Sequence, residues 1–167
     1  KAGAPVSVST FVRHGDRELQ IGNPSGPALF LNHSWQCYRQ ALRIHPFRPS
    51  RKTKASDTPS RRVYDYLEAI MASIVFAHTA IEAFANEEIP EDYQHTLLRR
   101  SGLYVVLGKL GIERETDLSE KLSTILPDVK KVPTPKGSKT WEDFVALKRM
   151  RDRIVHMKSS DRATSKQ

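Results

Sequence analysis

The feature that most constrains the fold is the apolar segment 61–88, in which large aliphatic residues recur at the spacing of an α-helix. At about 100° per residue they form one stripe, which consists of Val63, Leu67, Ile70, Ile74, Ile81 and Ala85. Ser60 can cap the first turn, and Pro90 ends the segment. The pattern predicts one long helix that forms the spine of the domain.

The same segment could be mistaken for a membrane span. Its most apolar part, residues 69–85, contains His78 and Glu82 and is short for a bilayer. We therefore expect a core helix and no membrane partner.

The rest of the chain predicts further helices separated by breaks. A first helix is expected over residues 28–44, and shorter helices over 93–110, closed by Gly111, and 117–126, closed by Pro127. A loop over 132–139 precedes a last helix over 141–158, for which Thr140 is the predicted cap. The predicted fold class is therefore all-α, a bundle of four to five helices.

The chain length of 167 residues suits one domain with flanking segments. Residues 1–27 are expected to form an irregular N-terminal arm, in which Val6, Val8, Thr10 and Val12 alternate as in a short strand. Residues 28–158 form the predicted helical domain, with a basic linker over 48–59. Residues 159–167 are expected to be a disordered tail.

The charge balance indicates a polyanionic partner. The net charge is +8, and no basic amphipathic helix with an aromatic apolar face stands out, which favours nucleic acid over a membrane. Cys37 is the single cysteine, so no intramolecular disulfide is possible and the reducing cytoplasm is the expected compartment.

One arginine lies where the last helix should be apolar. Phe144, Leu147, Ile154 and Val155 form a stripe along 141–158, and Arg151 falls in the middle of it. A guanidinium keeps its charge at any working pH and is almost never buried unpaired. Arg151 must therefore meet an anion, an internal acid or a wet cleft between subunits, which marks it as a site residue.

Two segments resemble the HEPN superfamily. Residues 151–156, RDRIVH, read as an arginine followed by a polar residue and a histidine five positions on, which resembles the RxxxxH signature. Residues 72–86 resemble the long HEPN helix, with its Glu-x-x-x-Asn ending at Glu82 and Asn86. The resemblance runs from about Ser60 to Lys158, and nothing before Ser60 contributes to it.

HEPN proteins are small and all-helical, and many are metal-independent ribonucleases of prokaryotic toxin and anti-phage systems, with the active cleft at a homodimer interface. The resemblance implies that this chain is a homodimeric endoribonuclease, a toxin or abortive-infection effector that acts on RNA. It also implies a cognate antitoxin such as a small nucleotidyltransferase. A non-catalytic HEPN module that binds RNA, nucleotide or a protein partner is the alternative, because a fold alone does not certify activity.

Cleavage of RNA without a metal needs a base for the ribose 2′-hydroxyl, an acid for the leaving 5′-oxygen and a cation for the charge that develops on phosphorus. His156 and Arg151 are the expected catalytic residues, because imidazole exchanges protons near neutral pH and a guanidinium fits two phosphate oxygens. They lie about 140° apart on an ideal helix, so one copy cannot converge both on one phosphate. Antiparallel packing of two copies would place both pairs around a shared groove.

Three residues are expected to support this site. Asp152 either orients Arg151 or His156, or makes local ion pairs at helical spacing. Glu82 and Asn86 are expected to hydrogen-bond toward the last helix. We expect His78, which lies nearer to the buried stripe, to be a hydrogen-bonded core histidine.

Further basic residues are candidates for RNA binding. Arg149 also competes for the catalytic arginine role, because it lies seven residues before His156 and so on nearly the same face. The candidate phosphate contacts are Arg149, Arg153, Arg51, Lys52 and Lys54.

A rival motif lies in the N-terminal arm. Arg13-His14-Gly15 resembles the R-H-G signature of histidine phosphatases, in which the histidine becomes phosphorylated. Those enzymes need an α/β sheet, which the remaining helical sequence does not predict. No phosphate-binding glycine loop, dinucleotide fingerprint or metal-ligand spacing is present, so no metal or cofactor is expected.

Overall fold

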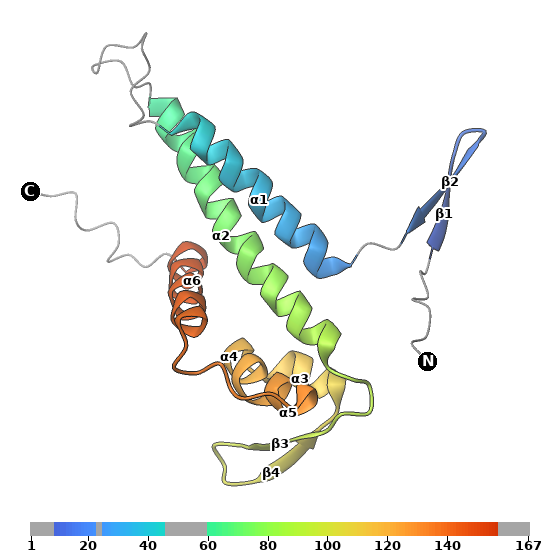
Figure 1. The fold of residues 1–167 in the computed structure, drawn as a ribbon, viewed down its shortest axis with the longest axis vertical. Helices are drawn as coiled ribbons and strands as arrows, with labels where there is room; N and C mark the ends of the chain where they lie inside the picture. The colour runs from blue at the N-terminus through green and yellow to red at the C-terminus, as the bar shows by residue number, and fades with distance from the viewer. Residues whose placement is uncertain (1–8, 23–24, 46–59, 157–167) are drawn as a thin grey trace, which may run out of the picture.

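The computed structural model describes residues 9–22, 25–45 and 60–156. Helices dominate these residues, and the strands form two short antiparallel hairpins (Figure 1). The predicted all-α class with an irregular N-terminal region is confirmed. Residues 46–59, which hold most of the basic linker and the candidates Arg51, Lys52 and Lys54, lie outside the described residues, as does the tail.

Two long helices form an antiparallel pair that extends away from the C-terminal half of the chain (Figure 1). Helix α1 spans Gly26–Ile44 and α2 spans Ser60–Glu88, as the sequence predicted for both. The hydroxyl of Ser34 donates to the carbonyl oxygen of Ser73 at 2.9 Å, and the rings of Phe30 and Phe76 stack 6.3 Å apart. Small and aromatic side chains therefore make the contact between α1 and α2.

The predicted buried stripe of α2 is only partly correct. Ala85 is buried and Ile81 packs against the core, but Leu67 is 45% exposed. Helix α1 covers the neighbouring stripe, which includes the buried Ala69 and Ala80, because small residues let two helix backbones approach closely. The larger aliphatic residues in the first half of α2 therefore lie at the side of the α1–α2 interface and not within it.

The hydrophobic core lies at the C-terminal end of α2 (Figure 1). It joins α2 to the shorter elements that follow and to the last helix. Its buried members are Ala85, Ile89, Leu107, Ile112, Leu118, Ile125, Leu126 and Phe144. This end of the molecule is where side chains from distant parts of the chain are brought together.

The predicted helix over 93–110 is wrong. Strands β3 (His95–Leu98) and β4 (Tyr104–Leu107) form a hairpin there, and Gly102 adopts a left-handed conformation (φ 80°) in the turn. Burial alternates along both strands, which is the period of a half-buried sheet. Helix α3 (Lys109–Glu115) follows, and Gly111, the predicted helix end, lies inside it.

Pro127 does not end a helix as predicted. Helix α4 (Leu118–Glu120) continues through a π-helical segment (Lys121–Ile125) into α5 (Leu126–Lys130). Proline lacks the N–H that would bond to the carbonyl of Ser123 in a regular helix, and the hydroxyl of Thr134 donates to that oxygen instead, at 2.8 Å. A donor from outside the helix therefore takes the place of the N–H that the proline lacks.

The last helix, α6, spans Lys139–Val155 and contacts α2. Its cap is Ser138, whose hydroxyl accepts from the backbone N–H of Trp141 at 3.2 Å, and not Thr140 as predicted. The helix ends at Val155 with His156 as its C-cap, so the predicted helix, which ran to Lys158, is too long at this end.

The N-terminal arm contains a hairpin of β1 (Ser9–His14) and β2 (Arg17–Gly22), so the predicted short strand is present from Ser9 onward. Arg13, His14 and Gly15 lie exposed at its tip, with Gly15 in a left-handed conformation (φ 59°). Within the described residues the sheets have two strands each, so the α/β sheet that a histidine phosphatase requires is not formed there.

Helix α2 extends beyond the apolar run 69–85 at both ends. By length and composition alone, residues Arg61–Glu88 would suffice to cross a bilayer. Core helices of soluble proteins satisfy the same criteria but are mostly buried, whereas 17% of the apolar window of α2 is buried, and Ala85 and Ile81 are the part of the helix that belongs to the core or packs against it. The helix by itself therefore assigns no location.

Candidate functional site

Arg151 lies on α6, which contacts α2, and it lines the same cavity as His78 and Glu82 of α2. Its Nη1 donates to Oδ1 of Asp152 at 2.8 Å, and 27% of the Arg151 side chain is exposed. The expectation that this guanidinium meets an acid is confirmed. Asp152 contacts Arg151 with its carboxylate, which agrees with the orienting role predicted for it.

Arg151 and Asp152 line a cavity of about 340 Å³ between α2, the end of α3, the α3–α4 turn and α6. The lining is almost wholly polar and charged. It consists of His78, Glu82, Glu113, Arg114, Thr116, Asp117, Leu118, Lys148, Arg151 and Asp152. Most small-molecule sites are lined mainly by apolar side chains with a few polar groups. The lining of this cavity is instead almost wholly polar, which suits a charged ligand with many hydrogen-bonding groups.

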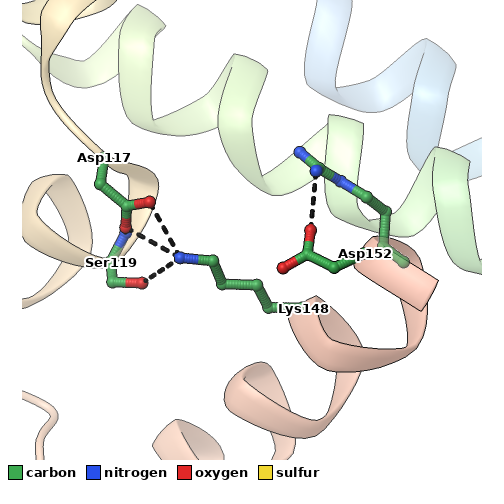
Figure 2. Close-up of polar contacts among 5 residues, drawn as sticks. Asp117, Ser119, Lys148 and Asp152 are labelled. Carbon is green, nitrogen blue, oxygen red and sulfur yellow. Dashed lines mark hydrogen bonds and ion pairs between the residues drawn. The ribbon is translucent and has the colours of Figure 1, made fainter. Parts of the chain in front are cut away.

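Lys148 crosses from α6 to the start of α4 (Figure 2). Its Nζ donates to both carboxylate oxygens of Asp117, at 3.0 and 2.9 Å, and to the hydroxyl of Ser119 at 3.1 Å. Burial alone would raise the pKa of Asp117, but hydrogen bonds from Lys148 and Ser119 lower it below the ordinary 3.8. This ion pair holds two walls of the cavity together.

Two buried polar atoms of the cavity have no hydrogen-bond partner among the described residues. They are Nε2 of His78, whose residue is 2% exposed, and Oγ1 of Thr116. Burial and then the neighbouring Arg151 lower the pKa of His78 below 6.5, against Glu82 and Asp152, which raise it. His78 is buried as predicted, but the hydrogen bond expected of a core histidine is missing at Nε2.

A buried lysine lies beside this cavity. Lys121 is 1% exposed, and its Nζ donates to Oδ1 of Asn86 at 2.8 Å and to the carbonyl oxygen of Glu113 at 2.9 Å. Burial lowers the pKa of Lys121. The ammonium therefore joins α2 to the end of α3 from its position in the π-helical segment.

The two residues of the predicted Glu-x-x-x-Asn ending have different surroundings. Glu82 lines the cavity with Arg151, but the hydrogen bond predicted from it to the last helix is not formed with the described residues of α6. Asn86 does not line the cavity, and it bonds to Lys121 instead of to α6.

The remaining predicted site residues lie outside the cavity. His156 is exposed at the C-terminal end of α6, where its backbone N–H donates to the carbonyl oxygen of Asp152 at 2.9 Å. Arg149 and Arg153 are exposed on α6. One copy of the chain therefore does not bring His156 and Arg151 together, as their separation on the helix predicted.

Sequence reasoning missed Lys148, Asp117, Thr116 and Lys121. The signal for Lys148 was present, because it lies three residues before Arg151 and so on the same face of α6. Thr116 and Asp117 follow α3 (Lys109–Glu115), whereas the sequence had predicted the preceding helix over residues 93–110. Lys121 carried no signal, because lysine is almost always expected at the surface.

No group of three or more histidine, cysteine, aspartate and glutamate residues in the described part of the chain could hold a metal ion. Comparisons with protein-family models, with curated proteins and with solved structures found no significant match to this chain. The resemblance to HEPN proteins therefore rests on the two segments that carry its motifs.

Proposed function

We propose that this protein is a metal-independent endoribonuclease of the HEPN type that acts as a homodimer. Arg151 binds the scissile phosphate, and His156 of a second copy exchanges one of the two protons. The observation that carries the proposal is the half-buried guanidinium of Arg151, which Asp152 holds at the wall of a polar cavity of about 340 Å³. A guanidinium in that position can stabilise the charge of a phosphorane.

The reaction balances with these groups. The ribose 2′-oxygen forms a bond to phosphorus as its proton passes to a base, and the bond from phosphorus to the 5′-oxygen breaks as that oxygen takes a proton from an acid. The products are a 2′,3′-cyclic phosphate and a 5′-hydroxyl. His156 is accessible for such a transfer, because it lies exposed at the helix end.

The exposed side of α1 supports assembly of two copies. Leu31, Trp35 and Tyr38 are spaced by four and three residues, and they are 61%, 57% and 39% exposed. Two copies related by a two-fold axis could pair their α1 helices in antiparallel orientation. Trp35 of each copy would then lie opposite Tyr38 of the other copy, because the two-fold axis relates one Trp35–Tyr38 contact to the second. A second copy would remove this apolar stripe from water.

The half-buried aliphatic stripe of α2 adds to that surface. This stripe includes Leu67. Its residues come one position after the residues of α2 that contact α1. The residues of the exposed stripe of α1 likewise come one position after the residues of α1 that contact α2. In an antiparallel helix pair these two stripes fall on the same side. The apolar side of the α1/α2 pair is therefore continuous.

Incubation with total RNA in excess chelator tests the function. We expect cleavage by the parent and a loss on the order of 10² to 10³ in rate for Arg151→Ala and for His156→Ala. Arg149→Ala, on the exposed side of α6, is the comparison, and a larger defect for it than for Arg151→Ala would transfer the arginine role to Arg149. If both test variants cleave as fast as the parent, the assigned site is wrong.

The second candidate is a non-catalytic HEPN module that binds RNA, nucleotide or a protein partner. It is favoured by one observation, which is that Lys148 and Arg151 are each already paired with a carboxylate, Asp117 and Asp152. RNA binding by the parent without cleavage would select this candidate. The roles of toxin or anti-phage effector, and a nucleotidyltransferase antitoxin as partner, come from the resemblance and belong to the proposal.

A further inference from the structure

The two unpaired polar atoms of the cavity point to a ligand. Buried polar side-chain atoms are nearly always hydrogen-bonded, so an exception calls for a partner that is absent from the chain itself. Here two exceptions, Nε2 of His78 and Oγ1 of Thr116, are covered atoms of residues that line the same cavity as Arg151. They come from different elements, since His78 lies on α2 and Thr116 follows α3.

Charged residues of both signs surround His78, and their effects on the protonation of its imidazole oppose one another. Arg151 and Lys148 face it from α6 and oppose its protonation, whereas Glu82 on α2 and Asp152 on α6 favour it. The cavity is also lined by Glu113 and Arg114 from α3 and by Asp117 before α4. Burial is the largest influence and lowers the pKa of His78, so the ring is neutral at neutral pH.

We propose that His78 is a further catalytic residue, the base that accepts the proton of the ribose 2′-hydroxyl at Nε2, and that Thr116 hydrogen-bonds to the same nucleotide. This inference rests on the proposed function. It makes His156 of the second copy the acid that protonates the 5′-oxygen, and Arg151 the cation that binds the phosphate between them. Each proton of the reaction then has a named donor or acceptor.

The assignment follows from the environment of each histidine. A base must be unprotonated before the reaction and able to reach the substrate. His78 meets the first condition and lines the cavity, but its Nε2 is covered in this structure, so the proposed role requires the cavity wall to open at His78 when RNA binds. His156 lies exposed on the helix end, outside the cavity. The two histidines are thus suited to opposite proton transfers.

The test is the pH dependence of single-turnover cleavage of a short single-stranded RNA in excess chelator. We expect a bell-shaped profile for the parent. His78→Gln, which keeps a polar side chain, should lower the rate by about 10² to 10⁴ and remove the acidic limb, because no base then titrates. His156→Gln should remove the alkaline limb, and Thr116→Val should lower the rate without changing either limb.

His14→Gln is the matched control, because His14 is an exposed histidine on the β1–β2 hairpin. The second measurement uses the parent protein and does not depend on how a variant folds. On addition of an RNA in which a methylene group replaces each bridging 5′-oxygen, which keeps the 2′-hydroxyls and cannot be cleaved, the NMR signals of the His78 ring should shift, whereas those of His14 should not.

The outcomes separate the two proposals. If the parent cleaves and His78→Gln keeps both the rate and the acidic limb, or if the His78 ring signals do not respond to the uncleavable RNA, the role of His78 is wrong while the nuclease function stands. If the parent does not cleave RNA, the proposed function fails, and the role of His78 as its base fails with it.

Discussion

The ammonium of Lys121 lies 2.8 Å from Oδ1 of Asn86, although the two residues are 35 positions apart and belong to different helices. Lys121 also donates to the carbonyl oxygen of Glu113, and it is among the most buried side chains in the described part of the protein. A charged group in that position needs every acceptor it has. This contact therefore links the C-terminal end of α2 to the elements that form the cavity.

Removal of the Asn86 acceptor should destabilise the fold. Asn86→Ala leaves the buried ammonium of Lys121 with one fewer acceptor, and a hydrogen bond to a charged group contributes about 1.5 to 3 kcal/mol. We expect a loss of that size in the free energy of unfolding, measured by urea titration. Asn86→Asp restores an acceptor and should lose less, and Glu68→Ala, at an exposed position of α2, should be neutral. Equal losses for Asn86→Ala and Glu68→Ala would contradict the role of this contact.

The stability of the protein should depend on pH through Lys121. Burial lowers the pKa of Lys121 below 10.5 in the folded protein. Between that lowered pKa and 10.5 the unfolded chain binds more protons than the folded one, so the free energy of unfolding rises with pH in this window. Lys121→Met has no titrating group at this position, so its free energy of unfolding does not gain this rise with pH. The free energy of unfolding of Lys121→Met minus that of the parent should therefore fall as pH rises from neutral toward 10.5.

The measurement is urea unfolding of the parent and of Lys121→Met over that pH range. Lys136→Met, at an exposed lysine, supplies the baseline for the loss of a surface charge. A difference between parent and Lys121→Met that stays constant with pH would show that burial does not perturb this lysine.

The hydroxyl of Thr134 should matter because of Pro127. Thr134→Val removes the donor to the carbonyl of Ser123, and we expect a cost of about 1 to 2 kcal/mol in unfolding free energy. In a Pro127→Ala background the backbone N–H at position 127 can donate to the carbonyl oxygen of Ser123. Thr134→Val should therefore cost less unfolding free energy in that background. A double-mutant cycle measured by thermal unfolding decides this, and strictly additive effects would refute the coupling.

The exposed stripe of α1 should carry the assembly of two copies. Trp35→Ser removes a large aromatic side chain from the proposed interface, and truncation of such a residue typically costs at least ~2 kcal/mol, or roughly 30-fold in the dissociation constant of the dimer. Sedimentation equilibrium of the parent and the variant measures it. Asn32→Ala, on another side of α1, should leave assembly unchanged. A parent that is monomeric at micromolar concentration would remove the basis for a site shared between subunits.

The sequence by itself determined the long elements and the unusual arginine. Helical periodicity, with a proline soon after the end of α1 and of α2, is a local signal, and it placed α1, α2 and most of α6 correctly. The need of a guanidinium for an anionic partner is equally independent of the fold, and Arg151 does pair with an acid. Both inferences hold because they depend on neighbours within one or two helical turns.

Only the tertiary structure decided what fills the space around Arg151. Thr116, Asp117 and His78 come from separate elements, and their meeting depends on a hairpin and a π-helical segment that no local pattern indicated. The choice of stripe on α2 was also a tertiary result, because packing against α1 favoured small residues over the larger aliphatic ones. The burial of Lys121 follows the same rule, since the acceptors that permit it lie 35 and 8 residues away along the chain.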